Sequence, residues 1–367
     1  MDAANQGDGM EGSGGVTRPA AEEAPGWIRE VRQAIRDADR DFFRVSPLRY
    51  WIDFLVSIVA AYLSAGIFLT FPAFSWQQIA CFPLAAFWLY RLGSLIHEVC
   101  HLGEHEMPLF KAAWNLCAGV MLLTPSPFFT RHHRDHHSQR FYGTPEDPEY
   151  VANVMEGGNP ASILGYTLHI LVFPVLVFLR FLLAPLSFVH PAVREWTLRR
   201  ASALTLNRRY ERKLTAADRR AILAVEIPCF LRALLIPLLV VLGLNHWSRV
   251  PLLYALAVAT VMLNQMRQLA DHHFEGDGQR VDLASHILDS CNFTRNDPLT
   301  LLFFPFSIRY HALHHLFPSM PYHNLKPAHE YLVATLPADS PYRQLDRIGW
   351  WSVARRTILG PAQAAAV

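Results

Sequence analysis

Residues 51–71, with the sequence WIDFLVSIVAAYLSAGIFLTF, form a long apolar run with one acid, Asp53, near its beginning. A helix needs about 20 predominantly apolar residues to cross the hydrocarbon core of a bilayer. Residues 78–96 form a second run of nearly this length, and only the short stretch FPAFSWQQ at 71–78 joins the two. The two runs therefore predict a hairpin of membrane-spanning helices.

The composition of the 367 residues agrees with a membrane protein, because 51% are hydrophobic and only 17% are charged. Soluble domains carry about 25% charged residues, so a water-soluble globule is disfavoured and a disordered chain is excluded. The formal net charge of +2 is too small to favour binding of nucleic acid. Five widely spaced cysteines form no CxxC pair, which argues against a disulfide scaffold or a zinc ribbon.

A second hairpin is predicted from the apolar runs 222–244 and 251–263, which the loop NHWSR joins. Residues 163–189 are also apolar, but Arg180 and two prolines interrupt them, so we expect an interfacial or re-entrant segment there. The expected fold class is thus an all-α integral membrane helical bundle. It has about four transmembrane helices in two hairpins, with five as the alternative count.

The remaining segments predict the domain limits and the orientation. Residues 1–26 are small, acidic and glycine-rich, which indicates a disordered tail without a signal peptide, and 27–50 resemble an amphipathic helix leading into the membrane. The membrane domain is expected over 51–340 and a C-terminal tail over 341–367. Residues 190–224 carry nine basic residues against three acids, and the positive-inside rule puts them in the cytoplasm. We therefore expect the N-terminus and the histidine clusters on the cytoplasmic side of a multi-pass protein.

Eleven of the 18 histidines form four clusters. The clusters are HEVCH at 97–101, HHRDHH at 132–137, His272–His273 and HALHH at 311–315. Because residues three or four apart share one face of a helix, the clusters at 97–101, 132–137 and 311–315 each direct two or three imidazoles the same way. Neutral imidazole is the commonest protein ligand for transition metals. Eight such histidines exceed what one tetrahedral zinc uses, so they suit two metal ions.

Other chemistries fit less of the sequence. His97–His101 reads as HExxH, which allows a membrane zinc protease with Glu98 as general base, but six clustered histidines then have no role. The sequence has no GxSxG, GxGxxG or P-loop motif, so neither serine hydrolysis nor a bound nicotinamide or flavin is expected. A metal-binding structural membrane protein is a third alternative.

The order and spacing of the clusters resemble the membrane fatty acid desaturase family over roughly residues 50–335. The family has three histidine boxes, and the third matches here within FSIRYHALHHLFPSMPYHNL at 306–325. The resemblance implies a cytosolic helical cap over a four-span bundle, two iron ions and O2 as co-substrate. It also implies nine metal ligands: His97, His101, His133, His136, His137, His272, His311, His314 and His315.

Several neighbours of the boxes are candidates for orienting a ligand through a hydrogen bond. These are His105, His132, Asp135 and His273, with Glu146 and Asp147 as further carboxylates beside the second box. His323 and His329 are expected at the surface or beside the ligands. We expect structural roles for the histidines outside the clusters, which are His169, His190, His246 and His286.

The resemblance implies an enzyme that puts a double bond into a fatty acyl chain, using O2 and two external electrons. A di-iron hydroxylase or ketolase acting on a lipid, carotenoid or alkane is the alternative, because one oxidant serves both outcomes. The expected partners are membrane lipids, an acyl substrate and a separate ferredoxin or b-type cytochrome with its reductase. Residues 301–306 (LLFFPF), Phe128 and Phe129 are candidates to line an apolar tunnel for the chain, with ordinary core or membrane contact as the alternative for each residue.

Overall fold

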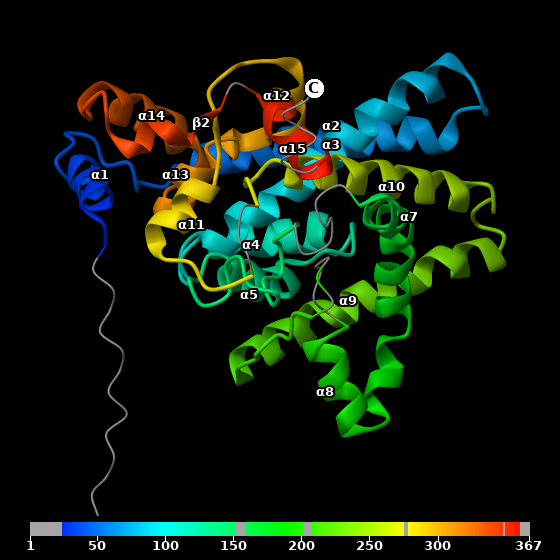
Figure 1. Ribbon diagram of the computed structural model, residues 1–367. Helices are drawn as coiled ribbons and strands as arrows, with labels where there is room; N and C mark the ends of the chain where they lie inside the picture. Colours follow the sequence, from blue (N-terminus) through cyan, green and yellow to red (C-terminus); the bar gives the residue numbers. More distant parts are fainter. Residues whose placement is uncertain are drawn as a thin grey trace, which may run out of the picture.

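The computed structural model describes residues 24–151, 159–201, 207, 209–274, 278–347 and 349–359. Within these ranges the chain is helical apart from loops and two strands of two residues each (Figure 1). Most of the tail expected at 1–26 lies outside the described residues. The chain is an all-α integral membrane helical bundle.

The first hairpin pairs α2 (Pro47–Thr70) with α3 (Trp76–His101). Ser75 begins α3 by accepting a hydrogen bond from the backbone N–H of Gln78, which satisfies one of the free donors of the first turn. Asp53 and Arg91 join the two helices through an ion pair of 2.6 Å. The predicted hairpin is present, and α3 continues beyond the expected end at residue 96, so that the HExxH sequence forms its last turn.

The second hairpin consists of α9 (Ala216–Val241) and α10 (Arg249–Gln268). Thr215 and Asp218 form a capping box that fixes the beginning of α9. In Figure 1 the tips of both hairpins lie at the right. Many apolar side chains of the two hairpins are exposed, as is expected of surfaces that contact lipid. Val59 and Leu63 of α2, for example, are each 64% exposed.

The interrupted segment expected at 163–189 contains a regular helix, α7 (Pro160–Leu182), which is a correction to the sequence analysis. Pro174 lies inside α7, and Glu226 of α9 holds the Arg180 guanidinium at 2.6 Å, so neither residue ends the helix. By length and composition, five described helices are thus able to cross a membrane. In Figure 1, α7 runs down the view, whereas the α9–α10 hairpin runs across it.

Short helices form a cap at the end of the bundle where α3 and α10 terminate. Between α3 and α7 the chain contributes α4 (Pro108–Trp114), the π-helix η1 (Asn115–Gly119) and α5 (Ser126–His136). After α7, η3 (Ala184–Phe188) and α8 (Pro191–Arg199) lead toward α9. After α10 follow α11 (Leu283–Asp289), α12 (Pro298–Phe303), η4 (Pro305–Ser307), α13 (His311–Leu316) and α14 (Tyr322–Thr335).

Both expected terminal segments differ from the structure. The helix expected over 27–50 is divided into α1 (Gly26–Arg36) and the start of α2, because the proline at 47 begins a new helix and favours an extended residue before it. The segment 341–367, expected as a tail, contains η5 (Pro341–Leu345), β2 (Asp346–Arg347) and α15 (Trp350–Leu359). Strand β2 pairs in parallel with β1 (Asn292–Phe293), so this end of the chain is part of the cap.

Three apolar cores hold these parts together. The first joins the α2–α3 hairpin to α4, α10 and α12, and the second joins α1 to α11, α13 and α14. The third core places Phe128 of α5 against Phe181 of α7 and Ile222 of α9. The cores therefore fix α3, α5 and α13, which carry the three histidine boxes, relative to one another.

An alanine at Gly119 tests the packing beneath α5. Its Cβ would lie 2.8 Å from Pro125 Cα and 3.1 Å from a ring carbon of Trp114, which is fully buried. Because backbone would have to shift, we expect Gly119→Ala to lower the free energy of unfolding by about 1–3 kcal/mol. Thermal unfolding in detergent, followed by circular dichroism, measures the effect.

Gly165→Ala is the matched control, because a Cβ at Gly165 in α7 meets nothing within 4 Å. Alanine is the better helix former, so this variant is expected to unfold at or above the temperature of the unmodified protein. Equal melting temperatures for the two variants would contradict the close packing at Gly119.

Candidate metal centre

The histidines of the three boxes converge because each box lies on one face of a helix or directly after one. His97 and His101 are one turn apart at the end of α3. In α5, a proline at the second helical position favours the start of a helix whose last turn carries His133 and His136, and His137 follows as its C-cap. Helix α13 carries the third box, and His272 lies in the loop after α10.

All nine predicted ligands are brought together in two groups. Within each group the nearest ring nitrogens all lie within 4.8 Å of one another. The first group consists of His97, His101, His133, His137 and His314, and the second of His136, His272, His311 and His315.

The spacing within each group fits a shared metal ion. In the first group, His133 Nε2 lies 3.0 Å from His101 Nε2 and 3.1 Å from His137 Nε2. In the second, His272 Nε2 lies 3.1 Å from both His136 Nε2 and His311 Nε2. Nitrogens about 2.0–2.1 Å from one ion are about 2.9–3.4 Å apart when they are neighbouring ligands. The donor set therefore fits two transition-metal ions.

Hydrogen bonds on the outer side of the first group fix which nitrogen faces inward. His97 Nδ1 lies 3.1 Å from Glu98 Oε1, and His133 Nδ1 lies 2.8 Å from Glu149 Oε1. A carboxylate only accepts, so each Nδ1 donates its proton and each Nε2 keeps a lone pair. The Nε2 atom of His97 is buried and has no hydrogen-bond partner among the described residues. A metal ion would supply that partner.

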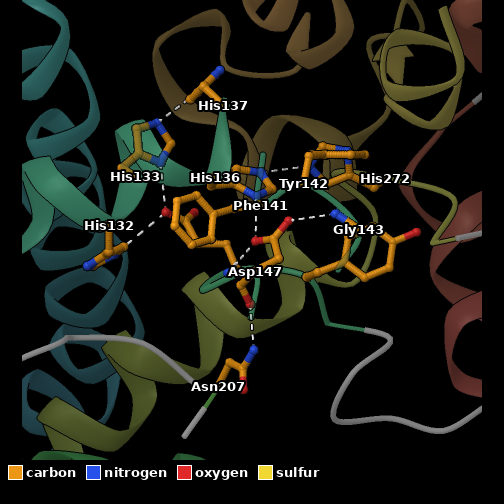
Figure 2. A network of polar contacts seen from close by, with 12 residues as sticks. His132, His133, His136, His137, Phe141, Tyr142, Gly143, Asp147, Asn207 and His272 are labelled. Carbon is orange, nitrogen blue, oxygen red and sulfur yellow. Dashed lines mark hydrogen bonds and ion pairs between the residues drawn. The ribbon is translucent and has the colours of Figure 1, made fainter. Parts of the chain in front are cut away.

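In the second group, Asp147 is the carboxylate that accepts a hydrogen bond from the outer nitrogen of a ligand. Its Oδ1 accepts from His136 Nδ1 at 2.9 Å, and its Oδ2 accepts from the Gly143 backbone N–H at 3.0 Å (Figure 2). Gly143 has a φ of +70°, a conformation that glycine adopts without strain. Asn207 donates to the Asp147 carbonyl at 2.7 Å. The carboxylate is thus held in place from several sides, and it makes the hydrogen bond to a predicted ligand for which the sequence analysis considered it.

The other ligands of the second group contact residues that the sequence analysis missed. Tyr142 donates to Asp289 Oδ2 at 2.7 Å, and its hydroxyl oxygen lies 2.8 Å from His272 Nδ1. His315 Nδ1 lies 2.8 Å from His286 Nε2, so His286 is a direct neighbour of a predicted ligand rather than a remote structural histidine. The partners in these pairs are far apart in the sequence, so no local sequence pattern predicts their contacts.

Burial and charge keep most of these imidazoles in the neutral form that binds metals. Burial, and then the charges of neighbouring basic groups, lower the pKa of six ligands well below the usual value. These are His133, His137, His272, His311, His314 and His315. Burial also lowers the pKa of His136, but Asp147 outweighs it and raises the pKa to about 9. Burial raises the pKa of Glu149 to about 7.

The four candidates for orienting a ligand have different surroundings. His132 is buried with its Nε2 3.5 Å from Glu149 Oε1, the carboxylate that also binds His133. Asp135 instead accepts from the Tyr210 hydroxyl at 2.7 Å, and His273 accepts from Arg347 at 2.8 Å. His105 is exposed in the loop after α3 and has no contact with a predicted ligand. Its proximity in sequence was therefore misleading, because the helix ends between His101 and His105.

An apolar cavity of about 530 Å³ adjoins the first histidine group. His97, His132, Glu149 and Phe129 line it at the histidine end, and side chains of α3, α7, α9 and α10 form its walls. Phe129 therefore lies where the tunnel prediction put it. The prediction was wrong for Phe128, which packs in the third core, and for 301–306, which contribute to the first core or are exposed.

Comparison with known proteins now identifies the family. The sequence model of the family described as fatty acid desaturase matches residues 73–346. The chain belongs to the fatty acid desaturase family. It is also 34% identical over 326 residues to the ceramide hydroxylase of Caulobacter vibrioides (strain NA1000 / CB15N), covering 88% of this chain and 91% of that protein. The chain is accordingly a membrane enzyme of a di-iron family, as the histidine boxes indicated.

The zinc-protease alternative has little support from the surroundings of Glu98. Its carboxylate accepts from the Tyr50 hydroxyl at 3.1 Å and from the Tyr322 backbone N–H at 3.2 Å, in addition to its contact with His97. A carboxylate held by three donors orients a ligand rather than activating water. His97 and His101 also share their group with three further histidines.

Removing one ligand from the first group tests metal binding directly. We expect the purified protein to contain about two metal ions per chain and His314→Ala to lose metal, because His314 Nε2 lies 3.2 Å from His137 Nε2 within the group. Plasma mass spectrometry measures the content. His105→Ala is the control and should keep the full content; equal content in both variants would contradict the site.

Asp147→Asn tests the outer hydrogen bond to His136. The amide is a weaker acceptor than the carboxylate, so we expect metal affinity to fall about 10–100-fold, measured by competition with a chelator. Glu146→Gln is the control, because this neighbouring carboxylate is exposed and should leave the affinity unchanged. An unchanged affinity in Asp147→Asn would show that the carboxylate does not support the metal.

Proposed function

We propose that the chain holds two iron ions on its nine converging histidines and uses O2 and two external electrons to hydroxylate a chain of a ceramide-like lipid. The observation that supports this most strongly is the apolar cavity that ends at His97 and Glu149, directly beside the first histidine group. The similarity to a ceramide hydroxylase along nearly the whole of both chains supports hydroxylation and an N-acylated lipid substrate.

The proposed reaction breaks one C–H bond and forms one C–O bond. One oxygen atom of O2 enters the lipid as a hydroxyl group, and the other leaves as water with two protons and the two electrons of the donor. The bound irons would supply the oxidising power that an unactivated C–H bond requires. Desaturation is the second candidate, favoured by the family match, and it would remove two hydrogens from the chain and release two waters.

The protein's own residues have three roles in this proposal. The nine histidines hold the irons, while Glu98, Glu149 and Asp147 orient individual imidazoles by accepting hydrogen bonds from their Nδ1–H groups. The apolar cavity walls exclude water and hold the lipid chain in one position. Because an alkyl chain has no polar group near its middle, the shape of the cavity then decides which carbon meets the metal centre.

The electron supply and the orientation belong to the same proposal. We place the histidine groups and the N-terminus on the cytoplasmic side, in agreement with the basic residues of 190–224. The sequence carries no cluster of cysteines for an iron–sulfur centre. A separate ferredoxin or b-type cytochrome with its reductase is the proposed donor.

Lipid analysis tests the reaction. The full chain is produced in a bacterium together with a ferredoxin and its reductase, the cells receive ceramide, and the extracted lipids are analysed by mass spectrometry. We expect a ceramide heavier by one oxygen atom, absent with His314→Ala and present with His105→Ala. A ceramide lighter by two hydrogens would instead support desaturation. Unchanged ceramide, with the donor shown to be active, would contradict the proposed substrate.

A further inference from the structure

One face of α10 presents a row of polar side chains to the otherwise apolar cavity. Thr260, Asn264 and Gln268 are spaced four residues apart, so they share one helix face, and all three line the cavity. Gln268 is the last residue of α10, four residues before His272. Since four residues span at most about 14 Å, this end of the row lies close to the second histidine group.

The three polar side chains differ in how they are satisfied. Thr260 donates its hydroxyl to the Leu256 carbonyl of its own helix at 2.8 Å, so it needs no ligand. The Oε1 atom of Gln268 is buried and has no hydrogen-bond partner among the described residues. Asn264 lines the same cavity and is half-buried. An amide oxygen without a partner, such as Gln268 Oε1, is costly in an apolar cavity unless a ligand or water completes it.

The neighbouring charges favour a neutral ligand at this position. Arg267 also lines the cavity, but Asp271 Oδ2 lies 2.5 Å from its guanidinium and neutralises it. The pair leaves no free positive charge on α10 for a carboxylate or phosphate; Arg232, the other guanidinium that lines the cavity, belongs to α9. On this face of α10 the groups that remain available are an acceptor, Gln268 Oε1, and the N–H donors of Asn264.

We propose that Asn264 and Gln268 bind the amide group of an N-acylated lipid, an inference that rests on the proposed function for the reaction that follows binding. The lipid amide N–H donates to Gln268 Oε1, and the lipid carbonyl accepts from Asn264 Nδ2. An ester or thioester has no N–H to donate, so it leaves the buried Gln268 oxygen unsatisfied. The pair therefore selects amide-linked lipids over acyl esters and holds the amide near the histidines.

Binding of matched lipids to the purified, metal-loaded protein tests this selectivity without requiring turnover. A fluorescent ceramide is displaced by unlabelled ceramide or by a diacylglycerol of the same chain lengths. We expect a preference for ceramide of about tenfold, as a buried acceptor left without its donor implies. Gln268→Met and Asn264→Leu, which nearly keep the side-chain volume, should each reduce this preference while the affinity for diacylglycerol and the metal content stay unchanged.

Thr260→Val is the matched control, because it removes a polar atom from the same helix face that is already satisfied. It should keep the preference for ceramide. A preference that survives in both Gln268→Met and Asn264→Leu would overturn the inference, as would equal binding of the two lipids, or tighter binding of a fatty acid, by the unmodified protein. Selective binding of ceramide without its oxidation would contradict the proposed function while leaving this inference intact.

Discussion

The structure depends on nine imidazoles that direct their ring nitrogens toward two common centres. Lone pairs about 3 Å apart repel one another unless a cation lies between them. Carboxylates behind His97, His133 and His136 fix the inward-facing nitrogen, so the ligands are arranged before any ion binds. The ligands come from α3, α5, α13 and the loop after α10, so the packing of these separate elements is what brings the nitrogens together.

The membrane helices connect this centre to an apolar substrate. Helices α3 and α10 end at the cap, so each runs from the lipid environment to a histidine group within one element. The cavity between α3, α7, α9 and α10 extends along these helices to His97. In the proposed function, a lipid chain reaches the centre through this cavity without crossing water, which is the condition that oxidation of an unactivated carbon requires. The amide side chains of Asn264 and Gln268 on α10 add two polar groups to the wall of this cavity.

The sequence revealed those parts of the protein that depend on local spacing. Apolar length predicted the two hairpins, and the HxxxH and HxxHH patterns predicted which histidines share a face. Contacts between distant parts of the sequence could not be predicted in this way. The contacts of Glu149 with His133, and of His286 with His315, depend on how separate elements pack. Proline and arginine suggested a break in α7, but Glu226 on another helix pairs with that arginine. His105 was a candidate only because it is close in sequence.

The occupancy of the two histidine groups tests the central claim most directly. Crystals of the purified protein, measured on both sides of the iron absorption edge, give the positions of the metals and their identity. The account predicts two iron peaks, one enclosed by His97, His101, His133, His137 and His314 and the other by His136, His272, His311 and His315. A single peak, or zinc alone in the group that contains His97 and His101, would contradict it.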